Sequence, residues 1–383
     1  MSASTSKLRQ AALRVKDYVA IGREAAGQNL FRAPGVLTRT VVARLSCDIG
    51  PVDFCLNDLA RRPRATWKDY LREEPQNYKL VRILHPQDVM GIARDKVVTA
   101  ERCVENGLPI IPILAVVGRR PEHPCQGRFP ILDTPEAIVE RLPEWPDNLF
   151  VKPVSGFLGE GVMALARDGD RWHDGNAVLS ASEVAARLLG YSDPTGVLVQ
   201  PRVANHPDVA AASSGPGLCA TRIITALTQD GPELVAAIHK ILGRDALADN
   251  FVGGATGNLL CGVDNETGRL SEGYGRRPRD RLLLHAYSRH PTTGRALKGV
   301  QLPYWPEARE LALRAATIFP ELPLLGHDIA ITPDGPLFLE TNTYWRINLP
   351  QLARGGLRPI LRDLIPRLVM PEERKREALR IVG

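Results

Sequence analysis

The sequence predicts an α+β protein with a helical N-terminal region. Residues 1–85 carry helical and basic patterns, whereas helical and strand patterns alternate from about residue 86 onward. Two pairs of strand patterns are joined by short turn sequences, at 229–232 and 333–335, which is typical of hairpins. We therefore expect three parts, with boundaries at 1–85, 86–200 and 201–383.

The length and composition are those of a globular protein with a sizeable core. The 383 residues suggest two or three domains, and 44% of the residues are hydrophobic and 24% are charged. The formal net charge of +6 suits anionic small molecules such as nucleotides. A nucleic-acid binder gathers its charge on one face, but the basic clusters at 61–64, 276–281 and 374–376 are short. We interpret them as solvated surface and expect no nucleic-acid partner.

The cysteines and the apolar runs bear on where the protein works. The six cysteines include no C-x-x-C pair and none at zinc-finger spacing from a histidine. We therefore expect mostly buried, reduced thiols in a cytoplasmic protein. No run of about 18 apolar residues occurs, so we expect no membrane span. The N-terminus lacks the apolar core of a secretory signal, and its spacing over 8–19 predicts a surface helix. The sequence leaves the oligomeric state open.

Each element expected after residue 86 has a local signal. The first helix ends at Asn106 and Gly107, a pair that closes helices well. The strands are β-branched runs bounded by turn residues, and 264–304 is rich in loop-forming residues. In order, we expect helix 95–107, strands 110–117, 149–154 and 162–166, helix 181–189, strands 196–203, 219–227 and 234–241, loops over 264–304, helix 307–319, strands 325–332 and 336–341, and helices 357–368 and 372–381.

A lysine and several glycines stand where two expected strands meet. The segment 150–161 reads FVKPVSGFLGEG, so Lys152 lies on the first strand and Gly156, Gly159 and Gly161 lie in the loop. Glycines let backbone N–H groups approach phosphate oxygens closely, and a lysine adds a point charge. A strand follows the loop and no G-K-[ST] occurs, so this is neither a P-loop nor a Rossmann turn. A plain β-turn with a surface lysine is the alternative.

The hairpin near residue 334 brings two carboxylates together. If 333–335 is a three-residue loop, Thr332 faces Pro336. Counting outward along the two strands then places Asp328 directly opposite Glu340. A register shift of one residue would break this pairing.

Such a hairpin face holds the ligands that a hard cation prefers. Asn342 lies two residues beyond Glu340 and therefore on the same face as the carboxylates. Opposed like charges destabilise a strand pair unless a cation binds them, and oxygen ligands suit Mg2+ or Mn2+. An exposed acidic hairpin is the alternative. We expect the other face to be buried, through Ile329, Ile331, Leu337 and Leu339.

Further polar residues stand out in the second half of the chain. Arg222 lies in an apolar strand, where an unpaired buried cation would be costly, so we expect it to face an anionic group in a site. A structural salt bridge is the alternative. The loop 248–254 is polar and glycine-rich and contains Asn250, which suits contact with phosphate or acceptor. Lys240 and Arg244 precede the loop and add positive charge.

The motifs occur in an order that is more specific than any one of them. They are Lys96, Lys152 with its glycine loop, residues 199–203, Arg222, Asp249 with Asn250, and Asp328 with 340–342. Over roughly residues 90–350 this order resembles the ATP-grasp superfamily, most closely the sugar-transfer-associated ATP-grasp proteins related to α-L-glutamate ligases. The resemblance implies an ATP-grasp fold, in which two α+β subdomains grip ATP between antiparallel sheets.

The resemblance also implies roles for individual residues. Lys152, Arg222 and Asn250 would act in catalysis, and the metal Mg2+ or Mn2+ would be held by Asp328, Glu340 and Asn342. ATP would be bound by Lys96, Lys152, Ser155, Gly156, Gly159, Gly161, Gln200, Pro201, Arg202 and Val203. Many members have an acidic residue near the position of Gln200, whereas this chain has none before Asp208. Adenine recognition is therefore expected to differ.

The function implied is that of an ATP- and Mg2+-dependent ligase. It would activate a small-molecule carboxylate as an acyl phosphate and join it to an amine, which needs no protein nucleophile. A small-molecule kinase with Asp249 or His239 as base is one alternative, and a non-catalytic nucleotide-binding module is another. We expect acceptor selectivity in residues 1–90 and 264–304. Alanine at Lys152, Asp328 or Glu340 should abolish ATP turnover without unfolding the chain.

Overall fold

The structure is a computed structural model of the chain. It describes residues 17–24, 33–118, 127–156, 161–191, 195–243 and 246–383. Of the surface helix expected at its start, residues 17–24 are helical and the earlier part lies outside the described residues. Five of the six cysteines are described; none of these five forms a disulfide, and all but Cys47 are buried.

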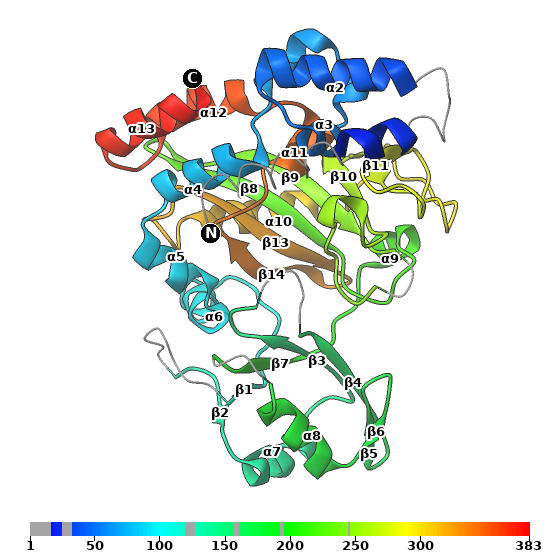
Figure 1. Cartoon of the computed structure of the whole chain (residues 1–383). Coiled ribbons are helices and arrows are strands. Elements are labelled where there is room, and N and C mark those ends of the chain that lie inside the picture. The colour runs from blue at the N-terminus through cyan, green and yellow to red at the C-terminus, as the bar shows by residue number, and fades with distance from the viewer. Residues whose placement is uncertain (1–16, 25–32, 119–126, 157–160, 192–194, 244–245) are drawn as a thin grey trace, which may run out of the picture.

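The described strands form two seven-stranded sheets, one below the other in Figure 1. Neighbouring strands are antiparallel except for the short parallel pair β1–β2. The smaller sheet has the order β2 (Ile131–Leu132), β1 (Ala115–Val117), β7 (Val197–Pro201), β3 (Asn148–Pro153), β4 (Met163–Asp168), β5 (Arg171–His173) and β6 (Val178–Leu179). The larger sheet has the order β12 (His285–Tyr287), β11 (Leu270–Gly275), β10 (Leu259–Val263), β9 (Gly231–Ile241), β8 (Ala220–Thr228), β13 (Leu324–Thr332) and β14 (Gly335–Asn342).

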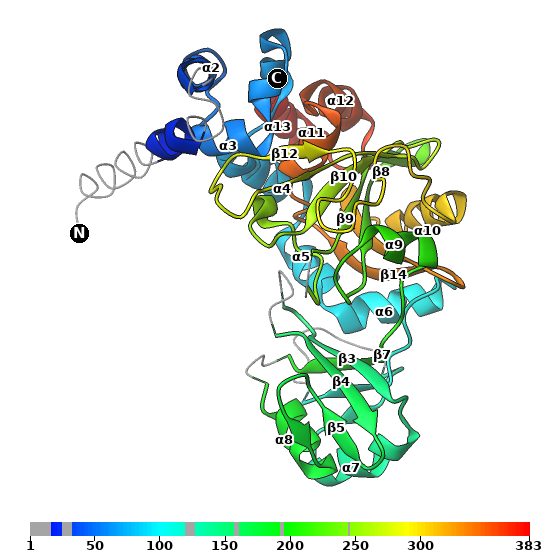
Figure 2. The same cartoon turned by 90° about the vertical axis from the view of Figure 1, so that its right-hand side faces the viewer.

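Helices cover both sheets (Figure 2). α7 (Pro135–Arg141) and α8 (Ala181–Leu189) pack on the smaller sheet, and Ser180 and Glu183 form a capping box that begins α8. α10 (Trp305–Ala316) packs on one face of the larger sheet, with the largest apolar core between them. α11 (Asn348–Arg354) packs against β9 and β10.

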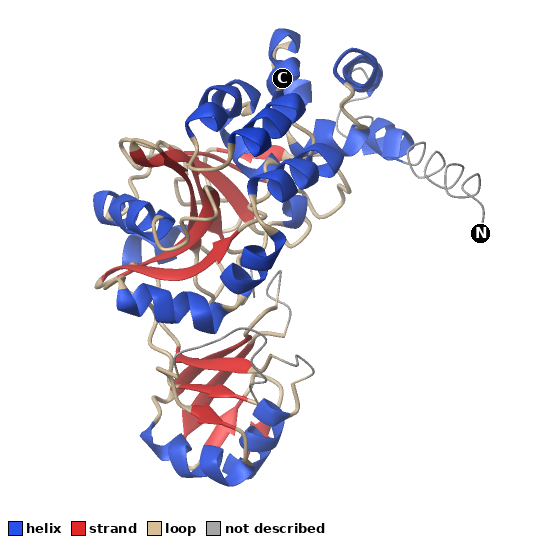
Figure 3. Cartoon of the chain, turned by 90° about the vertical axis from the view of Figure 1, so that its left-hand side faces the viewer, coloured by secondary structure: helices blue, strands red, loops and turns tan. Residues whose placement is uncertain are grey.

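The N-terminal helices and the C-terminal helices lie together beside the larger sheet (Figure 3). The N-terminal group includes α2 (Ala33–Cys47), α3 (Pro51–Leu56) and α4 (Tyr78–Leu84), and α4 packs against α13 (Glu372–Val382). α12 (Arg358–Leu364) lies between α13 and the short helices of the N-terminal region. α5 (Gln87–Arg94) and α6 (Lys96–Glu105) pack near β14 of the larger sheet, although they precede the smaller sheet in sequence.

Most expected elements are present with bounds close to those predicted. The helix at 95–107 is α6, which the Asp95 side chain caps by accepting from the N–H groups of Val97 and Val98. The strand expected at 110–117 begins only at Ala115, because Ile110 forms a single bridge to Phe338 instead. None of the described helices is long and apolar enough to cross a bilayer.

The loop prediction for 264–304 was wrong in part, since β11 and β12 lie within it, and β10 was missed. β11 reads LSEGYG, and two glycines weaken the strand signal in such a short run. The structure supplies the reason for one of them. A Cβ at Gly273 would lie 2.7 Å from the Leu297 side chain, so the tight packing of the following loop requires glycine there.

Candidate active site

A cavity of about 790 Å³ lies between the two sheets and reaches the N-terminal helices. This volume is in the range of small-molecule sites. Both sheets contribute charged side chains to the cavity, including Lys152 from β3 and Arg222, Lys240 and Asp328 from β8, β9 and β13. A small space of about 10 Å³ adjoins it and shares Lys96, Lys152 and Gln200. The structure therefore brings together residues that the sequence spreads over more than two hundred positions.

Four charged side chains form a continuous buried chain across three strands. Arg222 donates to both carboxylate oxygens of Asp328, from Nε at 2.7 Å and from Nη2 at 2.8 Å. Lys240 Nζ lies 3.0 Å from Asp328 Oδ2 and 2.9 Å from Asp249 Oδ2. The backbone N–H of Ala220 donates to Asp249 as well. Cations and anions alternate along this chain, so each buried charge has an opposite neighbour.

The electrostatics of this chain follow from burial and pairing. Burial by itself would raise the pKa of Asp328, but Arg222 and Lys240 outweigh it and hold the pKa well below its usual range. Burial would lower the pKa of Lys240, and Asp249 and Asp328 raise it instead. For Asp249 burial is the stronger effect and raises its pKa despite the contact with Lys240. Of the two carboxylates in this chain of charges, Asp328 is therefore more firmly ionised than Asp249.

The hairpin pairs Asp328 with Glu340, but not for the predicted reason. The predicted three-residue loop was wrong: Thr332 pairs with Gly335 across a two-residue turn. This turn by itself would place Asp328 opposite Leu339. A bulge between the Ile329–Phe338 pair and the Asp328–Glu340 pair adds one residue and restores the expected register.

The two-residue turn changes which apolar side chains are buried. Ile329 and Ile331 lie in the core, as expected, and Phe338 joins them there. The prediction for Leu337 and Leu339 was wrong: Leu337 pairs with Ala330 on the opposite face, and Leu339 lines the cavity beside Glu340. The turn shifts both leucines by one pairing position, and the extra residue of the bulge then brings Glu340 opposite Asp328.

The oxygen atoms at this hairpin fit part of a magnesium coordination shell. Arg222 and Lys240 together fill Asp328 Oδ2 and one position of Oδ1, which leaves a lone pair of Oδ1 for a cation. Asn342 Nδ2 donates to Glu340 Oε1 at 3.3 Å and leaves the amide oxygen available. Among the described residues no group of three or more His, Cys, Asp and Glu side chains is gathered. The set suits Mg2+, which keeps several waters and takes phosphate oxygens as further ligands.

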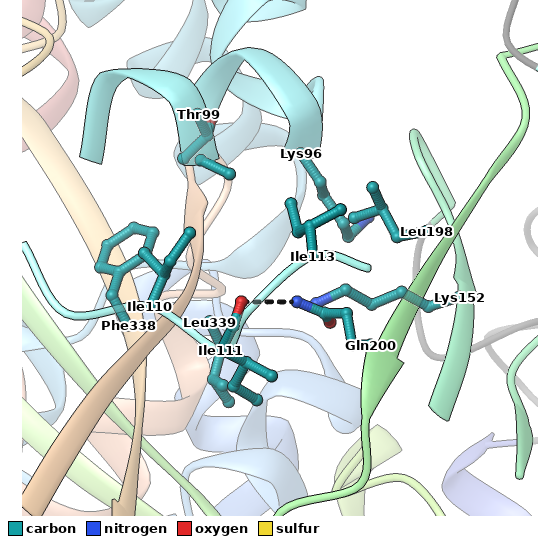
Figure 4. A pocket seen from close by; sticks show the side chains of 11 residues that line it. Lys96, Thr99, Ile110, Ile111, Ile113, Lys152, Leu198, Gln200, Phe338 and Leu339 are labelled. Atoms are coloured by element: carbon teal, nitrogen blue, oxygen red, sulfur yellow. Dashed lines mark hydrogen bonds between the residues drawn. The ribbon is translucent and has the colours of Figure 1, made fainter. Parts of the chain in front are cut away.

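Lys96 and Lys152 approach the site from different elements. Lys96, at the start of α6, donates from Nζ to the carbonyls of Gly156 at 2.9 Å and Val154 at 3.3 Å. It also lies 3.9 Å from Glu340 Oε2 and so joins the glycine loop to the carboxylate hairpin. Burial and the neighbouring Lys96 ammonium lower the pKa of Lys152 to about 8. In Figure 4, Lys152 and Gln200 extend side by side from β3 and β7 into the cavity.

The glycine loop is described only in part. Gly156 lines the cavity, and Gly159 lies outside the described residues. Gly161 has φ +71°, and a Cβ there would lie 3.0 Å from the Pro153 ring. Ser155 shares a hydrogen bond of 2.7 Å with the Thr195 hydroxyl and does not line the cavity. Of the described loop residues, Gly156 is therefore the one placed for ligand contact.

The expected hinge residues lie along the cavity where β7 leaves the smaller sheet. The side chains or backbones of Gln200, Pro201, Arg202 and Val203 all line it. Gln200 Nε2 donates to the carbonyl of Ile111 at 3.1 Å, shown as the dashed line in Figure 4. This bond accounts for a buried polar side chain without any nearby carboxylate.

Of two further residues singled out in the sequence, Asn250 lines the cavity and His239 does not. Asn250 lines the cavity, and its carbonyl accepts hydrogen bonds from Thr256 and Asn258. His239 shares a hydrogen bond of 2.9 Å with Thr221, and burial lowers its pKa to about 3. It is fully buried and does not line the cavity, so the structure contradicts its selection as a base for a kinase.

Sequence reasoning left several cavity residues out of the site. Lys240 was noted only as added charge, although it stands in an apolar strand as Arg222 does, and that same signal would have found it. The wall formed by the N-terminal region had no signal in the sequence. Its side chains, together with the segment after β14, are Glu73, Glu74, Tyr78, Arg82, Tyr344, Arg346 and Asn348.

The chain is similar, at low identity, to some solved structures. A search of curated proteins finds no match. Among solved structures, the D-alanine–D-alanine ligase from Coxiella burnetii shares 13% identity, with a TM-score of 0.39 over 76% of this chain and 60% of that one. The D-cycloserine synthetase DcsG shares 15% identity, with a TM-score of 0.41 over 81% of this chain and 78% of that one.

A family profile gives the more extensive match. The sequence model of the sugar-transfer associated ATP-grasp family matches residues 75–364, more than half of the chain. This range contains both sheets and the chain of charged residues on the larger sheet. The predicted resemblance is confirmed, and so is the α+β fold with a helical N-terminal region. The chain belongs to the sugar-transfer associated ATP-grasp family.

Proposed function

We propose that the protein is an ATP- and Mg2+-dependent ligase that activates a carboxylate as an acyl phosphate and joins it to an amine. The observation that carries this proposal is the cavity between the sheets, where Lys96, Lys152 and Arg222 face the Asp328–Glu340 hairpin. Cations that stabilise the phosphoryl group lie there beside oxygen ligands for a divalent ion. Membership of an ATP-grasp family supports the same reading.

The proposed first step is attack of the substrate carboxylate on the γ-phosphorus of ATP. The P–O bond to ADP breaks as the acyl phosphate forms, so charge moves from the carboxylate to the β-phosphate. Lys152 and Arg222 are positioned to stabilise this charge, and Lys96 holds the start of the glycine loop. When bound, Mg2+ would neutralise phosphate oxygens, held by Asp328, Glu340 and Asn342. In the second step the unprotonated amine attacks the acyl carbon and phosphate leaves, and the nitrogen gives up a proton to phosphate or solvent as the amide forms.

The surroundings of the two residues considered as bases favour a ligase over a kinase. In the phosphoryl transfer itself a hydroxyl acceptor must lose its proton, whereas a carboxylate acceptor is already ionised at neutral pH. No described histidine lines the cavity. Asp249 does line it, but its carboxylate accepts from Lys240 and from the N–H of Ala220. The kinase alternative therefore rests on a carboxylate that is already engaged.

The test is release of ADP and phosphate from ATP and Mg2+ with pools of carboxylic acids and amines, with hydroxylamine as a trap. We expect release to depend on an acid, and hydroxamate to form when hydroxylamine replaces the amine. Lys152→Ala should remove both products, while Arg380→Ala on the exposed face of α13 should keep them. Formation of ADP and a stable phosphoester without free phosphate would refute the ligase and establish the kinase.

A further inference from the structure

Two arginines and two tyrosines form a stack along one wall of the cavity. The Arg82 guanidinium lies 5.8 Å from the centre of the Tyr78 ring, and the Arg346 guanidinium lies 5.4 Å from that of Tyr344. The two rings meet edge to face, with centroids 6.4 Å apart. All four residues line the cavity. Arg82 and Tyr78 belong to α4, so the N-terminal region supplies half of the stack.

Neither guanidinium group forms a salt bridge in the part of the chain that the structure describes, although Arg346 lies near enough to the Glu73 carboxylate to lower its pKa. Neither lies within 4 Å of a described carboxylate, and both side chains are exposed to the cavity mouth. Contact with an aromatic face orients a guanidinium but leaves its N–H groups free to donate. Paired guanidinium groups of this kind suit a carboxylate or a phosphate, which they bind through two parallel hydrogen bonds.

The backbone and the neighbouring residues hold this wall in place. Arg346 has φ +61°, a conformation that few residues other than glycine adopt. The Tyr344 hydroxyl lies 3.5 Å from the Glu73 carbonyl, and the Asn348 N–H donates to the Glu73 carboxylate at 3.1 Å. Such a conformation persists only where the surrounding structure holds the backbone in place.

The stack adjoins the catalytic residues. A Cβ placed on Gly326 would lie 2.6 Å from the Trp345 Cβ and 3.4 Å from Arg222 Cδ. Trp345 stands between Tyr344 and Arg346 in the chain. The two stack residues therefore flank the tryptophan that lies beside Gly326, and Gly326 in turn lies beside Arg222. Arg82, Arg222 and Arg346 also line the same cavity.

Glu73 and Glu74 lie on the same wall and would repel an anionic ligand, but their effect is smaller than two full negative charges would give. Glu73 is buried and accepts the Asn348 N–H, and burial raises its pKa even though Asn348, Tyr344 and Arg346 act to lower it. The hydrogen bond from Asn348 and the nearby Arg346 guanidinium offset part of the charge that Glu73 presents. Glu74 is exposed at the rim of the cavity.

We propose that Arg82 and Arg346 bind a second anionic group of the acid substrate, apart from the carboxylate that reacts. This inference rests on the proposed ligase function. It names the substrate class as an acid with two anionic groups, the second being a carboxylate or a phosphate. Recognition of the acid would then depend on α4, a helix of the N-terminal region.

The test is calorimetric binding to the full chain in the presence of ADP and Mg2+. The probes are glutarate and O-phosphoserine, each compared with a partner that lacks the second anion, butyrate and serine. We expect each dianion to bind about tenfold or more tightly than its partner, as for a lost hydrogen bond to a charged group. The difference should disappear in Arg82→Ala and in Arg346→Ala, and persist in Arg380→Ala. Affinity for ADP should stay at the wild-type value in all three variants.

The outcomes separate this inference from the ligase proposal. A preference for glutarate identifies the second group as a carboxylate, and a preference for O-phosphoserine identifies it as a phosphate. Equal binding of dianion and partner would overturn the inference, as would no binding of any probe by a protein that binds ADP. An unchanged preference in both arginine variants would overturn it as well. Failure of the ligase proposal appears instead as the lack of acid-dependent ADP and phosphate release.

Discussion

If the proposed site binds nucleotide, the ammonium group of Lys152 should make that binding sensitive to pH. Burial and Lys96 lower its pKa to about 8, and only the protonated form attracts phosphate. As pH rises through 8 the free protein loses this proton, so the dissociation constant for ADP should increase, by up to about tenfold per pH unit. Titration of ADP at pH 7 to 10 measures this. Lys152→Arg should flatten the profile, because arginine stays protonated; a flat wild-type profile would show that Lys152 does not contact the nucleotide.

The role of Asp328 in stability differs from the sequence-based expectation. Its removal would leave Arg222 and Lys240 as buried cations without their shared partner. We therefore expect Asp328→Ala to lower the free energy of unfolding by about 3–5 kcal/mol as well as to abolish ATP turnover. Urea unfolding measures the loss.

Glu340→Ala is the matched control for that experiment. Glu340 is one-third exposed at its side chain, and its nearest cation, Lys96 Nζ, lies 3.9 Å away. We expect Glu340→Ala to abolish ATP turnover and to lower the free energy of unfolding by less than about 1 kcal/mol. Equal stability losses in the two variants would show that the buried chain of charges does not hold Asp328 as the structure indicates.

At the scale of elements, the first residues of β13 pack so closely against the segment after β14 that only glycine fits at position 326. A Cβ at Gly326 would lie 2.6 Å from the Trp345 Cβ, closer than carbon atoms can pack. Gly326→Ala should therefore displace the segment after β14 and lower the free energy of unfolding by about 1–3 kcal/mol. The thermal midpoint and the ADP affinity measure the two effects.

Gly35 offers the opposite case within a helix. A Cβ there has no neighbour within 4 Å, and the residue lies in the first turn of α2. Gly35→Ala should leave stability unchanged or raise it by up to about 1 kcal/mol. A similar loss in both variants would mean that the Gly326 effect is not the clash with Trp345.

At the scale of the whole molecule, buried histidines should make the fold sensitive to acid. His85, His239 and His327 are fully buried, and burial lowers the pKa of each to about 3. Between about pH 6.5 and 3 these histidines are protonated in the unfolded chain but remain neutral in the folded chain. The free energy of unfolding must therefore fall as the pH decreases through this window. The depressed pKa of Asp328 adds a further loss, below about pH 4.

A single substitution tests this prediction. His85 is fully buried where α4 ends, and burial is the largest cause of its lowered pKa. His85→Leu should reduce the slope of unfolding free energy against pH by about 1.4 kcal/mol per pH unit between pH 4 and 6. Unfolding in urea at several pH values gives the slope. An unchanged slope would show that His85 is protonated in the folded protein.

The sequence by itself determined the order of elements and the chemical character of the site. Turn residues and β-branched runs mark the hairpins β8–β9 and β13–β14, because these signals are local. A cation within an apolar strand indicated a functional position for Arg222, because burying an unpaired charge is costly. The spacing of Asp328, Glu340 and Asn342 indicated oxygen ligands on one hairpin face.

Only the tertiary structure decided which of these residues meet and in what geometry. The Arg222–Asp328–Lys240 contacts join strands 88 and 106 positions apart, and local patterns carry no information on which strands become neighbours. The turn has two residues instead of the predicted three, and the bulge near Leu339 compensates for the difference. The sequence pattern did not predict the bulge, since strand register depends on packing across the whole sheet. The arginine–tyrosine wall exists because α4 packs against the segment after β14, a contact between distant parts of the chain that no local signal specifies.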